Sequence, residues 1–181
     1  MYDVVIIGSG PAGISAAIYL KRAKKNVIIV SKHKSALQKA EKIENYYGIE
    51  SISGSELYNT GIKQAERLGI PIDEDEVTNI SYENNFIVTT VNKKYQAKYV
   101  IIATGTNRVT PNIKGIKEFE GKGVSYCAIC DAFFYRNKDV AVIGSGNYAI
   151  HEAEQLRPVV NSVTILTNGD KMVENRSSSD F

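Results

Sequence analysis

Short apolar runs along this chain alternate with glycine-rich turns and amphipathic segments. Residues 2–7 form the first apolar run, which is typical of a buried parallel strand. Glycines follow it directly, and residues 14–25 then place Ala, Leu and Ile on one helical face and cations at the end, where they suit the helix dipole. Residues 27–30 form the next apolar run. The pattern predicts a strand–helix–strand unit at the start of the chain.

The middle of the chain changes from helical to strand periodicity. Residues 53–68 predict an amphipathic helix, which Gly69 ends and which Pro71 prevents from continuing. Residues 77–102 alternate in the manner of strands, with turn signals at 84–85 and 92–93, and predict a small antiparallel meander. The last apolar run of this region, residues 99–103, is a buried strand that leads into Thr104 and Gly105.

The opening pattern returns near the end of the chain. A strand is predicted over 139–143, a tight turn over 144–146, a helix over 148–156 and a strand over 162–166. Prolines and glycines among mixed charges predict a linker in between. We therefore expect an α/β protein with two Rossmann-like dinucleotide-binding domains in tandem: a first domain over 1–110, a linker over 111–122, and an incomplete second domain over 123–181.

Composition narrows the possible partners. The chain has 181 residues, 43% of them hydrophobic, and a net charge of +2, which is too small to indicate nucleic acid or an acidic membrane surface. No segment reaches the roughly 18 unbroken apolar residues of a membrane helix. The N-terminus lacks the features of a secretory signal. A cytoplasmic location is therefore expected.

The motif Gly8-x-Gly10-x-x-Gly13 lies between a predicted strand and a predicted helix, which is the context that dinucleotide binding requires. Gly8 permits the tight turn, Gly10 lets the backbone approach a pyrophosphate at the helix N-terminus, and Gly13 allows close helix–strand packing. The acidic residue expected at the end of the second strand is missing, and Ser31 and Lys32 stand there instead.

The second glycine turn, residues 144–149, is a weaker copy of the first. Tyr148 adds bulk where a pyrophosphate would approach, and Ala149 takes the place of the third glycine. The next strand leads into residues 167–169, without the arginines that recognise NADP. A fold retained without its nucleotide is at least as good an interpretation of this copy as a working site.

The only two cysteines, Cys127 and Cys130, are separated by two residues. This spacing lets the sulfurs meet across one helical turn, and a thiolate at a helix start is stabilised and nucleophilic. Asp131 follows directly and can exchange the proton that leaving thiolates need. A zinc site usually needs about four ligands, and His33 and His151 show no ligand spacing, so redox chemistry is favoured over metal binding or an inert buried pair.

These motifs together resemble those of low-molecular-weight thioredoxin reductases. The resemblance covers residues 1–166, and its most specific segments are VVIIGSGPAG at 4–13, IENYYG at 43–48, ATG at 103–105 and GVSYCAICD at 123–131. It implies an FAD-binding first domain, a redox disulfide in the second, thioredoxin as the protein substrate, and a homodimer for the full-length protein. By resemblance, FAD is contacted by Gly8, Gly10, Pro11, Ala12, Gly13, Ser31, Lys32, Asn45, Ala103, Thr104 and Gly105.

The resemblance also implies a role for each residue of the dithiol segment. Cys130 would face the flavin, Cys127 would attack the disulfide of thioredoxin, and Asp131 would be the acid–base residue. The returning C-terminal segment of the family is absent after Phe181, so the chain is expected to be a C-terminally truncated member.

The sequence departs from the family in ways that concern the electron donor. Residues 167–169 replace the His-Arg-Arg set that binds NADPH, and residues 34–36 replace the usual Gly-Gly-Gln. Clostridial-type, ferredoxin-dependent flavin thioredoxin reductases are similar in lacking the NADPH motifs. Ferredoxin is therefore the expected donor. A conventional NADPH-dependent enzyme and a flavin redox sensor without turnover are the alternatives.

Overall fold

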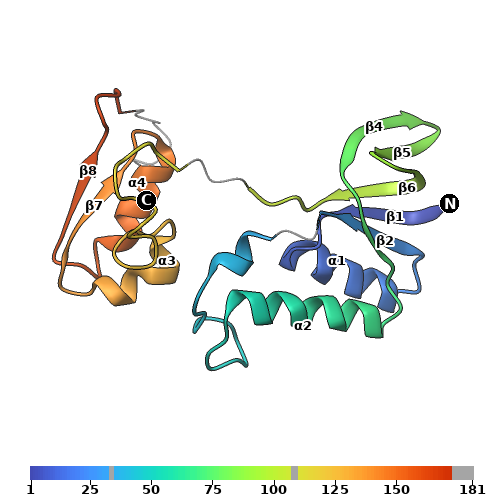
Figure 1. Ribbon diagram of the computed structural model, residues 1–181, viewed down its shortest axis with the longest axis horizontal. Coiled ribbons are helices and arrows are strands. Elements are labelled where there is room, and N and C mark those ends of the chain that lie inside the picture. The colour runs from blue at the N-terminus through green and yellow to red at the C-terminus, as the bar shows by residue number, and fades with distance from the viewer. Residues whose placement is uncertain (33–34, 107–109, 173–181) are drawn as a thin grey trace. The chain divides into compact units, whose positions relative to one another are not determined.

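The computed structural model describes residues 1–32, 35–106 and 110–172, and the chain divides into two compact units, Met1–Val109 and Thr110–Phe181 (Figure 1). The α/β Rossmann-like fold expected from the sequence is confirmed. The residues predicted as a linker, 111–122, belong to the second unit, where they form successive turns closed by a bridge between Glu120 and Val124.

The first unit is built on a six-stranded sheet of order β3-β2-β1-β6-β5-β4. Strands β3, β2, β1 and β6 are parallel, and the predicted meander β4–β5–β6 is antiparallel. Its elements are β1 (Tyr2–Ile7), α1 (Pro11–Arg22), β2 (Val27–Ser31), η1 (Ala36–Lys39), α2 (Gly54–Arg67), β3 (Ile72–Glu74), β4 (Val77–Glu83), β5 (Asn85–Thr90) and β6 (Lys94–Ile102). The three-residue strand β3 was not predicted.

The central strands are apolar throughout because both of their faces are covered. On one face Val4 and Ile6 pack with Ile14 of α1 and Ala65 of α2. On the other face Val5 and Ile7 pack in a second cluster that includes residues of β5 and β6. This burial on both sides explains why the alternation of apolar and polar residues expected of a surface strand is absent in residues 4–7.

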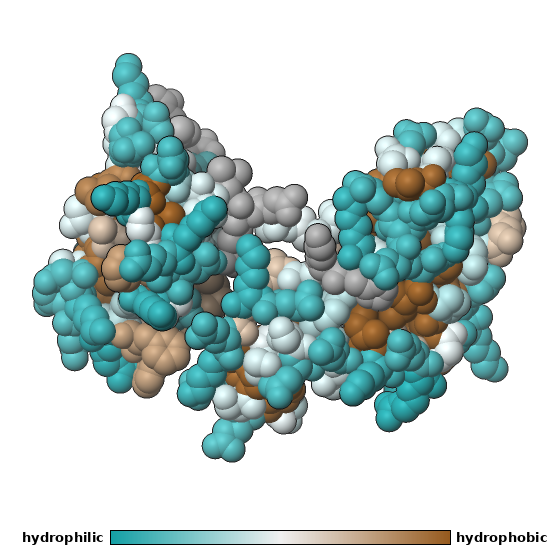
Figure 2. All heavy atoms as spheres, in the orientation of Figure 1, coloured by the Kyte–Doolittle hydropathy of each residue, from teal (hydrophilic) through white to brown (hydrophobic). Residues whose placement is uncertain are grey.

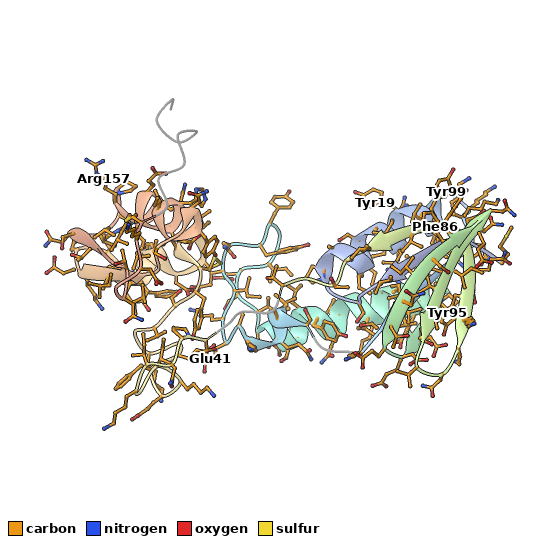
Figure 3. All side chains as sticks on the ribbon, turned by 90° about the horizontal axis from the view of Figure 1, so that it is seen from above. Tyr19, Glu41, Phe86, Tyr95, Tyr99 and Arg157 are labelled. Atoms are coloured by element: carbon orange, nitrogen blue, oxygen red, sulfur yellow. A yellow bond between two sulfur atoms is a disulfide. The ribbon has the colours of Figure 1, made fainter. Side chains whose placement is uncertain are left out.

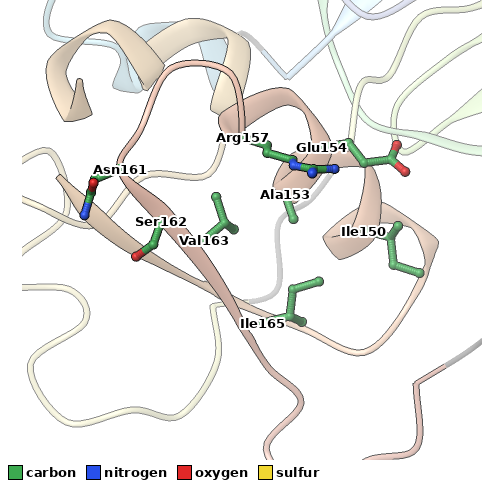
Figure 4. A pocket seen from close by; sticks show the side chains of 8 residues that line it. All are labelled: Ile150, Ala153, Glu154, Arg157, Asn161, Ser162, Val163 and Ile165. Carbon is green, nitrogen blue, oxygen red and sulfur yellow. The ribbon is translucent and has the colours of Figure 1, made fainter. Parts of the chain in front are cut away.

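The second unit contains the predicted strand–turn–helix–strand repeat. It consists of α3 (Ala128–Asp131), η2 (Ala132–Tyr135), β7 (Asp139–Ile143), α4 (Asn147–Leu156) and β8 (Ser162–Leu166), with β7 and β8 paired in parallel. Leu156 of α4 packs with Ala128 and Ala132 to form its small core. A hollow between α4 and β8 has an apolar floor that includes Val163 and Ile165 (Figure 4).

Most of the surface visible in Figure 2 is hydrophilic, and apolar residues gather only in limited patches. Within the described parts of the chain, no helix is both long enough and apolar enough to cross a membrane.

A buried carboxylate just after β3 accepts hydrogen bonds from the meander. Asp75 is 8% exposed and accepts hydrogen bonds from Thr90 Oγ1 at 2.7 Å and from the backbone and side-chain nitrogens of Asn92, both at 3.2 Å. The Thr90 hydroxyl is also the acceptor for the Lys93 N–H at 2.8 Å. Nearby, Asp73 accepts from Lys93 and from Tyr95, which lies on the meander in Figure 3.

The hydrogen bonds to Asp75 make the free energy of unfolding depend on pH. The bond from Thr90, with smaller contributions from the backbone of Glu76 and from Asn92, lowers the pKa of Asp75 below its usual 3.8. Because the folded pKa is the lower one, the stabilisation is complete above pH 3.8 and is lost as the pH falls through the folded value.

Replacing Thr90 by valine tests this network. The variant keeps the shape of the side chain but leaves a buried carboxylate and the Lys93 N–H each short of a partner, so its free energy of unfolding should fall by about 1–3 kcal/mol at neutral pH. Urea denaturation at several pH values should also show a weaker loss of stability on acidification. Thr78→Val is the control, because that exposed hydroxyl donates only to the Thr89 carbonyl. Equal stability of the two variants would contradict the assignment.

Candidate functional site

The glycine motif is folded as the sequence predicts, between the end of β1 and the start of α1. Gly8 has φ +110°, and a Cβ there would lie 2.3 Å from the carbonyl oxygen of Ala103. A Cβ on Gly13 would lie 1.9 Å from the carbonyl oxygen of Gly8. Both positions therefore require glycine, because the backbone of the loop lies directly against the residues that follow β6 on one side and against α1 on the other.

The N-terminus of α1 is open toward this loop. Gly10 is its N-cap and offers no side chain, Pro11 stands at the first helical position, and the first helical bond runs from Ile14 N–H to the Gly10 carbonyl at 3.0 Å. An added Cβ on Gly10 would have Ser35 Oγ as its nearest neighbour, at 3.6 Å. The backbone is thus accessible, and free N–H groups at a helix N-terminus suit a phosphate or pyrophosphate.

The parallel arrangement of β1 and β6 brings a second backbone segment to this loop. Ala103 N–H donates to the Ile7 carbonyl at 2.8 Å, so Ala103, Thr104 and Gly105 follow β6 beside the point where β1 ends. Gly105 has φ +69°, which turns the chain away from the sheet. Both segments therefore border the carboxyl edge of the sheet, where α/β folds bind dinucleotides.

Three buried hydroxyls lie beneath the glycine loop. Ser9 is 2% exposed, and its Oγ lies 2.8 Å from Ser31 Oγ and 2.9 Å from Tyr58 OH. Ser31, predicted to contact a cofactor, thus has its hydroxyl in contact with the loop. No local pattern in the sequence indicates the contact of Tyr58 with Ser9.

Two other predicted cofactor residues lie at the surface. Lys32 pairs with Glu76 at 2.5 Å. Asn45 is exposed in a loop whose base is closed by a bridge between Ile43 and Ile52.

The two cysteines of the second unit form a disulfide. The Sγ atoms are 2.13 Å apart and the Cα atoms 5.3 Å apart, with Cys127 at the N-cap of α3. Cys127 Sγ also accepts a hydrogen bond from the Cys130 N–H at 3.3 Å. The helix start expected at this spacing is confirmed, although α3 is only four residues long.

Ser125 connects the predicted acid–base residue to the disulfide segment. Its hydroxyl donates to the carboxylate of Asp131 and accepts the Cys127 N–H at 3.2 Å. Burial, and to a smaller extent the charge of Asp131, raise the pKa of Tyr135 nearby. Ser125 could not be identified from the sequence, because a serine two residues before a cysteine has no distinctive pattern.

Helix α4 supports the disulfide segment as well. Glu152 accepts the Ala128 N–H at 2.6 Å, and Tyr148 OH donates to the Tyr126 carbonyl at 3.3 Å. The ring of Tyr148 is exposed beside the second glycine turn. Residues 167–170 form a tight turn closed by a bond from Asp170 N–H to the Thr167 carbonyl, and no cationic side chain lies within it.

Metal ligands do not cluster in the part of the chain that the structure describes: no three His, Cys, Asp or Glu side chains are placed to hold an ion. His151 is exposed on α4, and His33 lies outside the described residues.

Comparison with known proteins places these features in context. The sequence model of the pyridine nucleotide-disulphide oxidoreductases matches residues 2–180. The thioredoxin reductase of Ureaplasma parvum is 45% identical over 173 residues, which cover 93% of this chain and 55% of that protein. The crystal structure of thioredoxin reductase from Streptococcus pyogenes has a TM-score of 0.85 and 35% identity, covering 98% of this chain and 59% of that one. For thioredoxin reductase from Giardia duodenalis the TM-score is 0.88 and the identity 32%, with 97% and 59% covered. The chain thus spans somewhat more than half the length of these relatives.

Proposed function

The chain belongs to the pyridine nucleotide-disulphide oxidoreductase family, and on that premise we propose that it acts as a flavin-dependent disulfide oxidoreductase that reduces thioredoxin. The observation that carries the proposal is the Cys127–Cys130 disulfide with Asp131 beside it. Ser125 connects the two by hydrogen bonds, because its hydroxyl accepts the Cys127 N–H and donates to the Asp131 carboxylate. The relatives named thioredoxin reductase support the choice of substrate.

The first unit is suited to FAD. Its glycine loop leaves backbone N–H groups accessible at the start of α1, and neither Gly8 nor Gly13 has room for a side chain. Residues 8–13 would hold the pyrophosphate, with Ala103, Thr104 and Gly105 beside them, and with Asn45 and Lys32 as further contacts. When bound, FAD supplies a carrier that takes up reducing equivalents and delivers a pair of electrons to a disulfide.

The reduced cysteines would then exchange their electrons with thioredoxin. The Cys127 thiolate attacks one sulfur of the thioredoxin disulfide, forming a mixed disulfide and releasing a thiolate that takes a proton from the Asp131 carboxyl. The Asp131 carboxylate next accepts the proton of Cys130. The resulting Cys130 thiolate attacks Cys127 Sγ, restores the disulfide and releases the second thioredoxin sulfur, which takes that proton. One disulfide is reduced and one is formed, so electrons and protons balance.

Asp131→Asn should lower thioredoxin turnover by about 10²-fold or more, because the amide cannot exchange a proton with the leaving thiolates. Steady-state kcat with saturating thioredoxin measures the effect. Asp170→Asn is the matched control, since Asp170 is exposed and the hydrogen bond that closes its turn is made by its backbone. An Asp131→Asn enzyme within threefold of wild type would remove the acid–base role.

We further infer that ferredoxin, rather than NADPH, delivers the electrons. The exposed Tyr148 ring lies beside the second glycine turn, where a pyrophosphate would approach, and the turn at 167–170 offers no cation for a 2′-phosphate. NADPH stays the competing donor, because the family is named for pyridine nucleotides. A flavin redox sensor without turnover is the third possibility, and turnover of thioredoxin with any donor would exclude it.

The deciding experiment follows flavin absorbance under anaerobic conditions. The full-length protein is mixed separately with excess NADPH, NADH and photoreduced ferredoxin, and thioredoxin is then added. Bleaching by ferredoxin alone, followed by thioredoxin reduction, supports the proposal. Rapid bleaching by NADPH overturns the choice of donor and restores the conventional enzyme. A protein that transfers no electrons to thioredoxin from any donor overturns the reductase function itself.

A further inference from the structure

We propose that Tyr58 and Ser31 are positioning residues that fix the glycine loop through Ser9 and so hold the backbone that is proposed to bind the pyrophosphate. The inference rests on the proposed FAD site and concerns how that site is held in shape.

The three hydroxyls come from three separate elements. Ser9 belongs to the loop, Ser31 is the last residue of β2, and Tyr58 lies in α2, 49 residues beyond Ser9. All three side chains are more than nine-tenths buried. Two hydrogen bonds, of 2.8 and 2.9 Å, converge on one oxygen, Ser9 Oγ. Buried hydroxyls that bond one another in this way hold the backbone between them in one arrangement.

Gly8 and Gly10 have no side chains, so Ser9 alone can anchor this part of the loop through a side-chain hydrogen bond. Backbone contacts complete the attachment, since the Gly8 N–H donates to the Val30 carbonyl at 2.9 Å. The N-terminus of α1 has no side-chain cap. The orientation of its N–H groups toward a pyrophosphate therefore depends on the loop that Ser9 anchors.

The end of β2 does not offer a carboxylate to a ribose. Ser31 is 7% exposed with its hydroxyl against Ser9, and the neighbouring Lys32 is paired with Glu76. The three hydroxyls therefore act on the loop that is proposed to hold the pyrophosphate. A defect in the hydroxyl set should therefore reduce affinity for ligands that contain the pyrophosphate.

Tyr58→Phe in the full chain tests the inference. The ring is kept and one hydrogen bond to Ser9 is removed, so the dissociation constant for FAD, measured by fluorescence titration of the apoprotein, should rise about 3- to 10-fold. Calorimetric titration with ADP should show a similar loss, whereas adenosine, which lacks phosphate, should bind as to wild type. Tyr19→Phe is the matched control, because Tyr19 is 77% exposed on α1 and its ring is directed away from the fold (Figure 3).

Ser31→Ala is a second, independent variant that removes the other bond and should give the same pattern, so a folding defect of one variant does not decide the outcome. FAD binding within twofold of wild type in both variants would overturn the inference and leave the FAD site standing. Equal losses for adenosine and ADP would also overturn it, by indicating a direct ribose contact or a general structural effect. A wild-type apoprotein that binds neither FAD nor ADP would overturn the proposed site and this inference together.

Discussion

Cys127→Ser and Cys130→Ser should each lower thioredoxin turnover by at least about 10³-fold, on the scale at which replaced nucleophiles act in other enzymes. Each step of the proposed exchange needs both sulfurs: one to attack thioredoxin and one to resolve the mixed disulfide. Turnover is measured with thioredoxin and whichever donor bleaches the flavin. FAD binding should be unchanged, because the residues proposed to hold the cofactor lie in the first unit.

The two serine variants control for each other. The chain has only two cysteines, and both are in the disulfide, so each variant should show one reactive thiol where the oxidised wild type shows none. If Cys127 is the attacking thiol, Cys130→Ser should accumulate a stable mixed disulfide with thioredoxin and Cys127→Ser should not. The opposite result would exchange the two roles. Near wild-type turnover in either variant would exclude the dithiol mechanism.

Gly13→Ala should destabilise the first unit by roughly 3 kcal/mol, the upper end of the usual cost of overpacking, and should abolish measurable FAD binding. The added Cβ would lie 1.9 Å from the Gly8 carbonyl oxygen and 3.4 Å from Ile6 Cγ2, so α1 has to move away from the loop. That movement displaces the backbone proposed to hold the pyrophosphate. Urea denaturation and FAD titration measure the two effects.

Gly61→Ala is the matched control in the neighbouring helix. Its Cβ would lie 3.6 Å from Ile14 Cγ2, an ordinary contact, and alanine has the better helix propensity. This variant should gain about 0.5–1 kcal/mol and bind FAD normally. A Gly13→Ala protein as stable as wild type, with FAD affinity intact, would show that the loop and α1 are not packed as described.

The sequence predicted the elements whose signals are local. The strand–glycine–helix order, the meander and the second repeat are confirmed, because apolar period and turn residues are properties of neighbouring residues. The helix predicted over 14–25 spans Pro11–Arg22 instead, and the strand predicted as buried over 99–103 leaves Tyr99 and Ile102 66% and 69% exposed. Strand β3 was missed because three residues are too few to show a period. Its presence depends on pairing with β2, where Ile72 lies opposite Ile29.

In the candidate site, likewise, the local motifs could be predicted and the contacts between distant residues could not. Spacing alone indicated a strand–loop–helix turn at Gly8, Gly10 and Gly13 and a helix start at the two cysteines. Each set spans only a few consecutive residues, so its pattern is local. The contact between Tyr58 and Ser9 could not be inferred, since it depends on how α2 is set against the loop. Within that helix Leu57 and Ile62 are only partly buried, whereas Tyr58 is 6% exposed.

The number and the spacing of the cysteines limit what the disulfide does to folding. Because the chain has two cysteines, only one intramolecular pairing exists, so oxidative refolding has no mispaired isomers. The ring that the bond closes is also short, which restricts the unfolded chain little: loop-closure entropy for about four residues is worth only about 2 kcal/mol. Reduction of the bond therefore removes only this short constraint, and the second unit should stay folded through each redox cycle.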